Sequence, residues 1–188
     1  TFGFFSKKIN PESRLYNPDL GGGAILDVGC YPVSFSILLA NLKQTNVPDP
    51  EILNVYGSIC KTGVDEIAYA SLVFEKKIIA KIGAAIRFQM KNQTSIIGTK
   101  GNILINNPWL PNKKSFIEIN SKQRSYKSFI NSELDIFANQ INKVNKCILD
   151  GKKEAEFPAM RWNDTIKNML IIDEWKKKLF KVNNEKNH

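Results

Sequence analysis

Apolar residues recur at helical spacing in three parts of the chain, and between these parts they alternate with polar residues. Positions three or four apart share one face of a helix, whereas alternate positions share one face of a strand. The pattern predicts helices over 24–42, 132–151 and 162–180. Pro32 lies inside the first of these helices and is expected to kink it.

The alternating segments predict strands that are joined by short turns. Strands are expected at 1–6, 52–59, 68–74 and 78–88, with one hairpin formed by 94–98 and 102–105 and a less regular edge hairpin within 106–131. Short connections favour antiparallel pairing, because parallel strands need a long crossover. The sequence therefore predicts an α+β fold, in which helices pack on one face of a single open, mainly antiparallel sheet. A large apolar face is typical of an interface, so we expect a homodimer or higher homo-oligomer through the other face.

Composition and charge narrow the class of protein. The 188 residues carry a formal net charge of +9, but the lysines are dispersed and do not alternate with aromatic residues, so we expect no nucleic-acid partner. Cys30, Cys60 and Cys147 lie far apart without metal-ligand spacing, which predicts neither disulfides nor a metal site and favours a cytoplasmic location. We identify no membrane-spanning run of about 18 apolar residues. The chain opens on an apolar strand without Met, which suggests part of a longer protein, and its single histidine, His188, is the last residue.

The candidate catalytic residues follow shortly after three consecutive glycines. In the segment GGGAILDVGCYPV, residues 21–33, Asp27 and Tyr31 are four positions apart and would share one helix face. The alternative is a packed helix start, in which Asp27 caps or pairs and Tyr31 belongs to the core. Arg14 precedes the glycines and is a candidate for binding a substrate oxygen or a phosphate, or for a surface salt bridge.

Three further residues are candidates for binding. Trp109 lies in a loop rich in proline, where it either lines a pocket or packs beneath the loop. Arg161 and Trp162 open the last predicted helix, where an anionic group could dock. The alternative for Trp162 is a place in the core.

Several segments together resemble a known family. Besides 21–33, these are Arg14-Leu15, Asp19-Leu20, the GVDE segment 63–66, the IGTKG segment 97–101 and the PAM segment 158–160. In this order they resemble the C-terminal domain of the glucose-fructose oxidoreductase / inositol dehydrogenase / rhizopine-catabolism family of NAD(P)-dependent sugar dehydrogenases. The resemblance covers residues 2–179. It implies a fold like the C-terminal domain of glyceraldehyde-3-phosphate dehydrogenase, a substrate-binding and oligomerisation domain over 1–180, and a frayed tail over 181–188.

The resemblance also implies an activity, the transfer of a hydride between a nicotinamide and a sugar, cyclitol or related diol. Tyr31 matches the acid/base position of this family, and Asp27 matches a carboxylate that orients the substrate or tunes that partner. Because the ordinary pKa of tyrosine is about 10, Tyr31 would need a nearby cation to act as a base.

Two signatures of the complete enzyme do not occur in the sequence. They are the GxGxxG cofactor fingerprint and the family's Glu-Lys-Pro motif with its catalytic lysine. We therefore expect NAD or NADP to bind mainly to an N-terminal domain outside this chain, and the chain alone to be inactive. The alternative is a non-catalytic binding or dimerisation module with the same fold.

Overall fold

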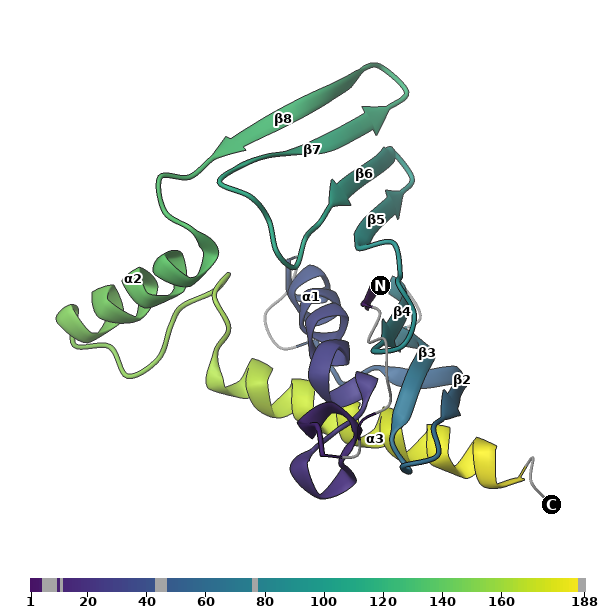
Figure 1. Ribbon diagram of the computed structural model, residues 1–188. Helices are drawn as coiled ribbons and strands as arrows, with labels where there is room; N and C mark the ends of the chain where they lie inside the picture. The colour runs from purple at the N-terminus through teal and green to yellow at the C-terminus, as the bar shows by residue number, and fades with distance from the viewer. Residues whose placement is uncertain (5–9, 11, 43–46, 76–77, 186–188) are drawn as a thin grey trace. The chain divides into compact units, whose positions relative to one another are not determined.

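The computed structural model describes residues 1–4, 10, 12–42, 47–75 and 78–185. Contacts between Cα atoms divide the chain into two compact units, one formed by residues 1–91 with 162–188 and the other by 92–161. Each unit has its own four-stranded open sheet, and the described residues include three α-helices (Figure 1). The predicted α+β class is confirmed. The prediction of a single sheet is wrong, because strands β4 and β5, though consecutive, belong to different sheets.

The sheet of the first unit has the strand order β1-β4-β3-β2. Its strands are β1 (Phe2–Gly3), β2 (Glu51–Ile59), β3 (Asp65–Phe74) and β4 (Ile78–Ala85). The β2, β3 and β4 strands pair antiparallel, as their short connections predict, whereas β1 pairs with β4 in parallel. The long segment between β1 and β4 supplies the crossover that parallel pairing requires.

Two helices cover one face of this sheet. Helix α1 (Cys30–Asn41) packs against β4 and against helix α3 (Trp162–Glu185), which in turn packs against β2. The strand residues facing the helices are buried, and on β3 they alternate as Ala68, Ala70, Leu72 and Phe74. The opposite face carries large side chains that are exposed in this chain: Leu53, Tyr56, Tyr69 and Ile79.

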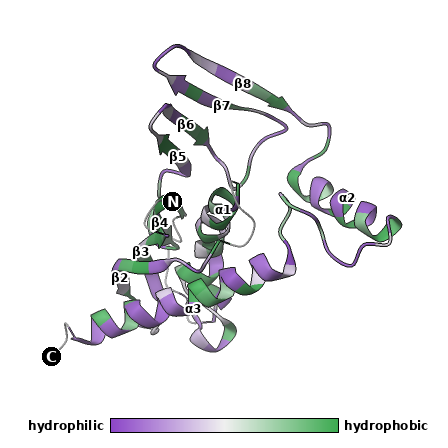
Figure 2. Ribbon diagram, turned by 180° about the vertical axis from the view of Figure 1, so that it is seen from behind, coloured by the Kyte–Doolittle hydropathy of each residue, from purple (hydrophilic) through white to green (hydrophobic). Residues whose placement is uncertain are grey.

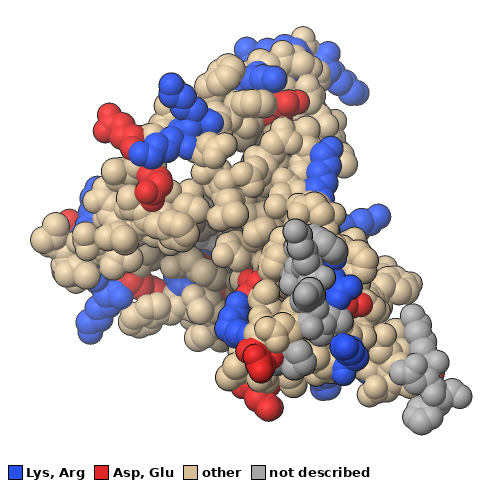
Figure 3. Space-filling model, viewed as in Figure 1, with Lys and Arg blue, Asp and Glu red and all other residues tan. Residues whose placement is uncertain are grey.

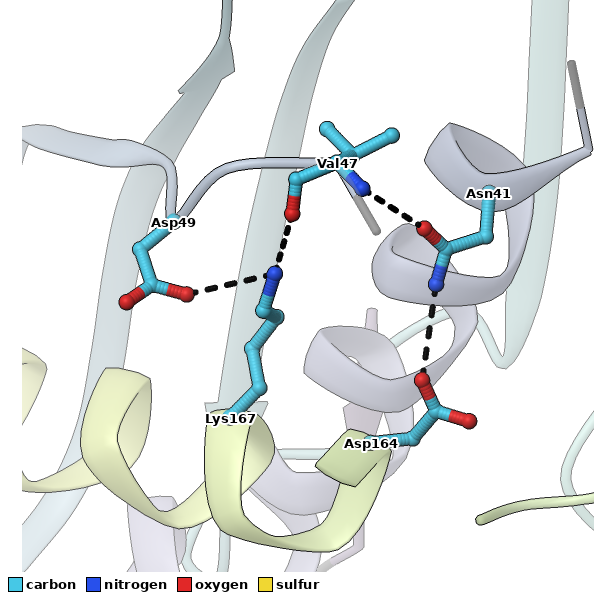
Figure 4. A network of polar contacts seen from close by, with 5 residues as sticks. All are labelled: Asn41, Val47, Asp49, Asp164 and Lys167. Atoms are coloured by element: carbon cyan, nitrogen blue, oxygen red, sulfur yellow. Dashed lines mark hydrogen bonds and ion pairs between the residues drawn. The ribbon is translucent and has the colours of Figure 1, made fainter. Parts of the chain in front are cut away.

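A polar network ties the end of α1 to the beginning of α3 (Figure 4). The Asn41 side chain accepts from the Val47 backbone N–H at 3.2 Å and donates to Asp164 at 3.4 Å. Lys167 donates to the Val47 carbonyl and lies 3.3 Å from the Asp49 carboxylate. The segment after α1 is therefore fastened to α3 from both sides.

The second unit contains a regular antiparallel sheet in sequence order. Its strands are β5 (Gln93–Gly98), β6 (Gly101–Asn106), β7 (Lys114–Ser121) and β8 (Ser125–Asn131). Both predicted hairpins are thereby confirmed. The amphipathic helix α2 (Ile136–Leu149) follows (Figure 2). It begins four residues later than predicted, because Asp135 caps it by accepting from the Ala138 N–H.

Two predictions about the helices differ from the structure. Helix α3 continues to Glu185 and ends five residues beyond the predicted end, so the described part of the predicted frayed tail is helical.

The segment Pro18–Asn41 is long and apolar enough to cross a membrane, although no such segment was expected from the sequence. Within the structure, 56% of its apolar window is buried, as in core helices.

Candidate functional site

The three glycines form a turn whose backbone packs directly against the segment that carries Arg14. The Gly22 N–H donates to the Asn17 carbonyl at 2.9 Å, and the Gly23 N–H donates to the Leu15 carbonyl at 3.0 Å. A Cβ atom on Gly22 would lie 2.7 Å from the carbonyl oxygens of Arg14 and Asn17. Only glycine permits this approach, and the approach fixes where Arg14 lies.

Arg14 and Asp27 form an ion pair between the short 3₁₀-helix Arg14–Tyr16 and the turn that follows the glycines. The Arg14 side chain is 57% exposed, whereas that of Asp27 is 16% exposed. The structure thus shows the alternative in which Asp27 pairs, and also the alternative in which Arg14 forms a surface salt bridge, since the two residues are each other's partners. Because a carboxylate has about four acceptor positions, Asp27 can hold Arg14 and still accept from a ligand hydroxyl.

Tyr31 lies on the surface of the first unit, so the alternative that it belongs to the core is wrong. The residue is 42% exposed. Its ring meets the ring of Phe2 edge to face, with centroids 5.1 Å apart. Partial burial, with smaller contributions from Cys30 and Asp27, raises the pKa of the Tyr31 phenol above its ordinary value. Tyr31 therefore holds its proton at neutral pH and can donate it.

Asp27 and Tyr31 are not joined by a regular α-helix. Residues Ile25–Gly29 form a π-helical turn, and α1 begins only at Cys30. We call Ile25–Gly29 the π-turn. Pro32 therefore falls in the first turn of α1, directly after the π-turn, and not inside one continuous α-helix. The same-face argument from ideal spacing is therefore only approximate, although Asp27 is close enough to affect Tyr31 electrostatically.

Two buried residues that the sequence analysis did not identify as site residues hold the π-turn at its ends. Asp65, at the start of β3, is fully buried and accepts from the Ile25 N–H at 2.7 Å. Desolvation raises the pKa of its carboxyl group from 3.8 to about 6, although backbone N–H groups and Lys176 favour the ionised form. Asn168 of α3 donates to the Cys30 carbonyl at 3.1 Å.

The sequence contains a signal for each of these residues. Asp65 belongs to the GVDE segment, one of the segments that carry the family resemblance. Asn168 is a polar residue that shares helical spacing with the buried apolar positions of α3 (Ile171, Ile172, Trp175 and Leu179). A polar side chain on an apolar helix face is expected to satisfy a specific buried partner.

The other predicted binding residues lie elsewhere along the chain. Trp109 is buried in the second unit, in the connection between β6 and β7. Arg161 ends the second unit, and Trp162 opens α3, as predicted. Trp162 is 60% exposed, so the alternative that it belongs to the core is wrong.

Charge and potential metal ligands are dispersed. Lys and Arg side chains are scattered over the face shown in Figure 3 and do not form one continuous stripe. Within the described part of the chain, no group of three His, Cys, Asp or Glu residues is placed to hold a metal ion.

Comparison with known proteins places this geometry in a family. The family model of the GFO/IDH/MocA C-terminal domain matches residues 1–104. A trans-1,2-dihydrobenzene-1,2-diol dehydrogenase from Xenopus tropicalis is 32% identical over 177 residues, which are 90% of this chain and 51% of that protein. The human protein of the same name is 31% identical over 108 residues, covering 57% of this chain and 31% of the relative. The chain thus spans at most about half the length of these relatives.

Solved structures show the same fold at low sequence identity. An aldose-aldose oxidoreductase from Caulobacter crescentus, complexed with glycerol, superposes with a TM-score of 0.75 at 20% identity, covering 93% of this chain and 50% of that one. A 3-ketoreductase from Actinomadura kijaniata, in complex with NADP and TDP-benzene, gives a TM-score of 0.73 at 20% identity, covering 92% and 50%. Because the family model matches more than half of the chain, the protein belongs to the GFO/IDH/MocA family, and this chain corresponds to its C-terminal domain.

Proposed function

We propose that this chain is the substrate-binding domain of an NAD(P)-dependent oxidoreductase that acts on a CH–OH group of a sugar, cyclitol or diol. The observation that carries the proposal is the grouping of Arg14, Asp27 and Tyr31 behind the glycine turn, in a chain of the GFO/IDH/MocA family. Its relatives include diol dehydrogenases by name.

Each of the three residues has a separate role. Asp27 accepts a hydrogen bond from a substrate hydroxyl and so orients the carbon that reacts. The exposed guanidinium of Arg14 holds the Asp27 carboxylate in place through their ion pair and can also donate to a substrate oxygen. Tyr31 is the acid/base group, within reach of the oxygen on the reacting carbon.

The protonation state of Tyr31 favours one direction of reaction. A phenol with a raised pKa gives its proton to a carbonyl oxygen as the hydride arrives at carbon, which is the reduction step. In the oxidation step Tyr31 must first lose its proton, and a cation beside it would be needed to lower its pKa. We propose that a residue outside this chain supplies that cation.

The nicotinamide cofactor would supply or accept the hydride. Among the described residues, the one parallel strand pair, β1 with β4, is not accompanied by the glycine fingerprint of a dinucleotide fold. We therefore assign most of the cofactor's binding surface to a domain outside this chain. From this chain, Arg161 and Trp162 would contribute a cation for phosphate and an exposed aromatic face.

Replacement of Tyr31 by phenylalanine in the full-length protein tests the proposal. The matched control is Tyr56→Phe, because Tyr56 is exposed on the open face of the first sheet. With NAD and NADP and a panel of sugars and diols, we expect Tyr31→Phe to lower kcat by about 10²-fold or more. Tyr56→Phe should leave kcat unchanged. Equal turnover in the two variants would exclude Tyr31 as the acid/base group, and no turnover by the wild type would favour a non-catalytic binding module.

We also propose that the open face of the first sheet binds a second copy of the chain. Leu53, Tyr56, Tyr69 and Ile79 expose apolar surface there, and such a face is typical of an interface. Sedimentation of the full-length protein should show a dimer or larger oligomer that Tyr56→Lys shifts towards monomer. A wild-type monomer at high concentration would contradict this assembly.

A further inference from the structure

The π-turn is held at both ends by buried polar side chains that come from distant parts of the chain. It begins at Ile25, two residues before Asp27, and passes into α1 at Cys30, one residue before Tyr31. A π-turn is rare in proteins and has one more residue per hydrogen-bonded ring than an α-turn. It therefore needs surroundings that favour it over the regular helix.

The first end is fixed by Asp65 on β3. Its Oδ2 atom accepts from the Ile25 N–H at 2.7 Å, and the side chain is fully buried. Gly23 lies so close to Oδ1 of Asp65 that a Cβ atom would overlap with it, and Gly23 has a φ of +111°. The backbone entering the π-turn is thus pressed against this carboxylate as well as hydrogen-bonded to it.

The second end is fixed by α3. Asn168, which is 5% exposed, donates from Nδ2 to the Cys30 carbonyl at 3.1 Å. A Cβ atom on Gly29 would lie 3.0 Å from the ring of Trp175, so the end of the π-turn packs closely on the buried indole. The backbone next to Tyr31 is therefore held by a hydrogen bond and by packing.

The direction of Tyr31 depends on this turn. Successive residues of an α-helix point about 100° apart around its axis. If the π-turn relaxed to a regular helix, the register would slip by one residue, and Tyr31 would turn by about that angle relative to Asp27. Its edge-to-face contact with Phe2 would then be lost.

We propose that Asp65 and Asn168 are positioning residues, which hold the π-turn so that Asp27 and Tyr31 face the same substrate. Neither residue touches the substrate. This inference rests on the proposed function for its catalytic consequence, but the geometric claim can be measured without any turnover.

The variants are made in the full-length protein. Asp65→Ala and Asn168→Ala remove the two contacts, and Asp65→Asn keeps an oxygen acceptor for the Ile25 N–H. The control is Asn41→Ala. Asn41 is 8% exposed and makes two hydrogen bonds with its side chain, but it lies at the opposite end of α1. All measurements are made at a temperature where circular dichroism shows every variant folded.

The first measurement is the nuclear Overhauser effect between the rings of Phe2 and Tyr31, assigned with Tyr31→Phe. We expect the effect to be lost or strongly weakened in Asp65→Ala and Asn168→Ala and to persist in Asp65→Asn and Asn41→Ala. An effect that persists in both alanine variants of the positioning pair would overturn the proposal, whatever the activity of the protein.

The second measurement separates kcat from KM. Misplacement of a reacting group by about 1 Å can cost about 10²-fold, so we expect Asp65→Ala and Asn168→Ala to lower kcat at least 10-fold with little change in KM. Asn41→Ala should lose stability but keep its kcat, and Asp65→Asn should recover most of the activity. If the ring contact is lost while kcat is unchanged, the positioning role is wrong. If the wild type is inactive, the proposed function fails, and the ring contact alone decides whether the two residues hold the π-turn.

Discussion

Ionisation of Asp65 is expected to make the protein less stable as the pH rises. In the unfolded chain the carboxyl group titrates near 3.8, whereas burial raises its pKa to about 6 in the folded protein. The folded state therefore retains a proton that the unfolded chain releases. The stabilisation associated with this proton is complete below pH 3.8 and is lost as the pH rises through 6.

The size of the effect follows from the two pKa values. A rise from 3.8 to about 6 corresponds to about 3 kcal/mol of unfolding free energy between the two limits. About 2 kcal/mol of this falls between pH 4.5 and 7.5, where urea unfolding can be followed through the fluorescence of buried Trp175. Because Asp65→Asn cannot ionise, the stability of the wild type relative to this variant should decrease by that amount.

The prediction can be tested with a control variant and by the sign of the change in relative stability with pH. Asn168→Ala also removes a buried polar contact but no ionisable group, so its difference from the wild type should not vary with the Asp65 titration. If the wild type instead gains stability relative to Asp65→Asn as the pH rises, hydrogen bonds from the Ile25 and Ala24 N–H groups outweigh desolvation. Parallel pH profiles would likewise refute the reasoning.

Two further substitutions test the contacts around the site, both by urea unfolding. Gly23→Ala would place a Cβ atom against Asp65 at a residue with a positive φ, so we expect the free energy of unfolding to fall by at least about 2 kcal/mol. Gly63→Ala should lower it less, because Gly63 also has a positive φ, +86°, but no atom lies near its Cβ position. A smaller loss in Gly23→Ala than in Gly63→Ala would refute the role of the close approach. Lys167→Met removes the hydrogen bond to the Val47 carbonyl and the ion pair with Asp49, and it should lower the free energy of unfolding by about 1 kcal/mol. Asp49→Asn should cost less, since the carbonyl contact remains.

Local patterns account for the elements of this fold better than for their arrangement. The alternation of Ala68, Ala70, Leu72 and Phe74 predicts β3 because one face of that strand is buried. The division into two sheets is not predictable in this way. Ile86 and Met90, in the connection after β4, are buried where a simple hairpin turn would be exposed, and β5 pairs only with β6. The parallel pairing of β1 also depends on contacts across some eighty residues of sequence.

Local sequence patterns also predict only part of the candidate site. Sequence spacing selects Asp27 and Tyr31, and the structure shows that Arg14 is the ion-pair partner of Asp27. Helical periodicity does not distinguish a π-turn from an α-turn over five residues. The turn is fixed by Asp65, which is 40 positions from Ile25, and by Asn168, which is 138 positions from Cys30.

The first unit is built from two stretches of chain, and this has a consequence for synthesis on the ribosome. Helix α3 supplies Trp175 and Leu179 to the interior, yet it is translated after the eight strands of the described residues. A nascent chain that has not reached Trp162 leaves the apolar sides of α1 and β2 without their cover, a state in which polypeptides readily aggregate. Premature stop codons before this helix should therefore yield insoluble products, even where every residue of the Arg14–Asp27–Tyr31 group has already been made.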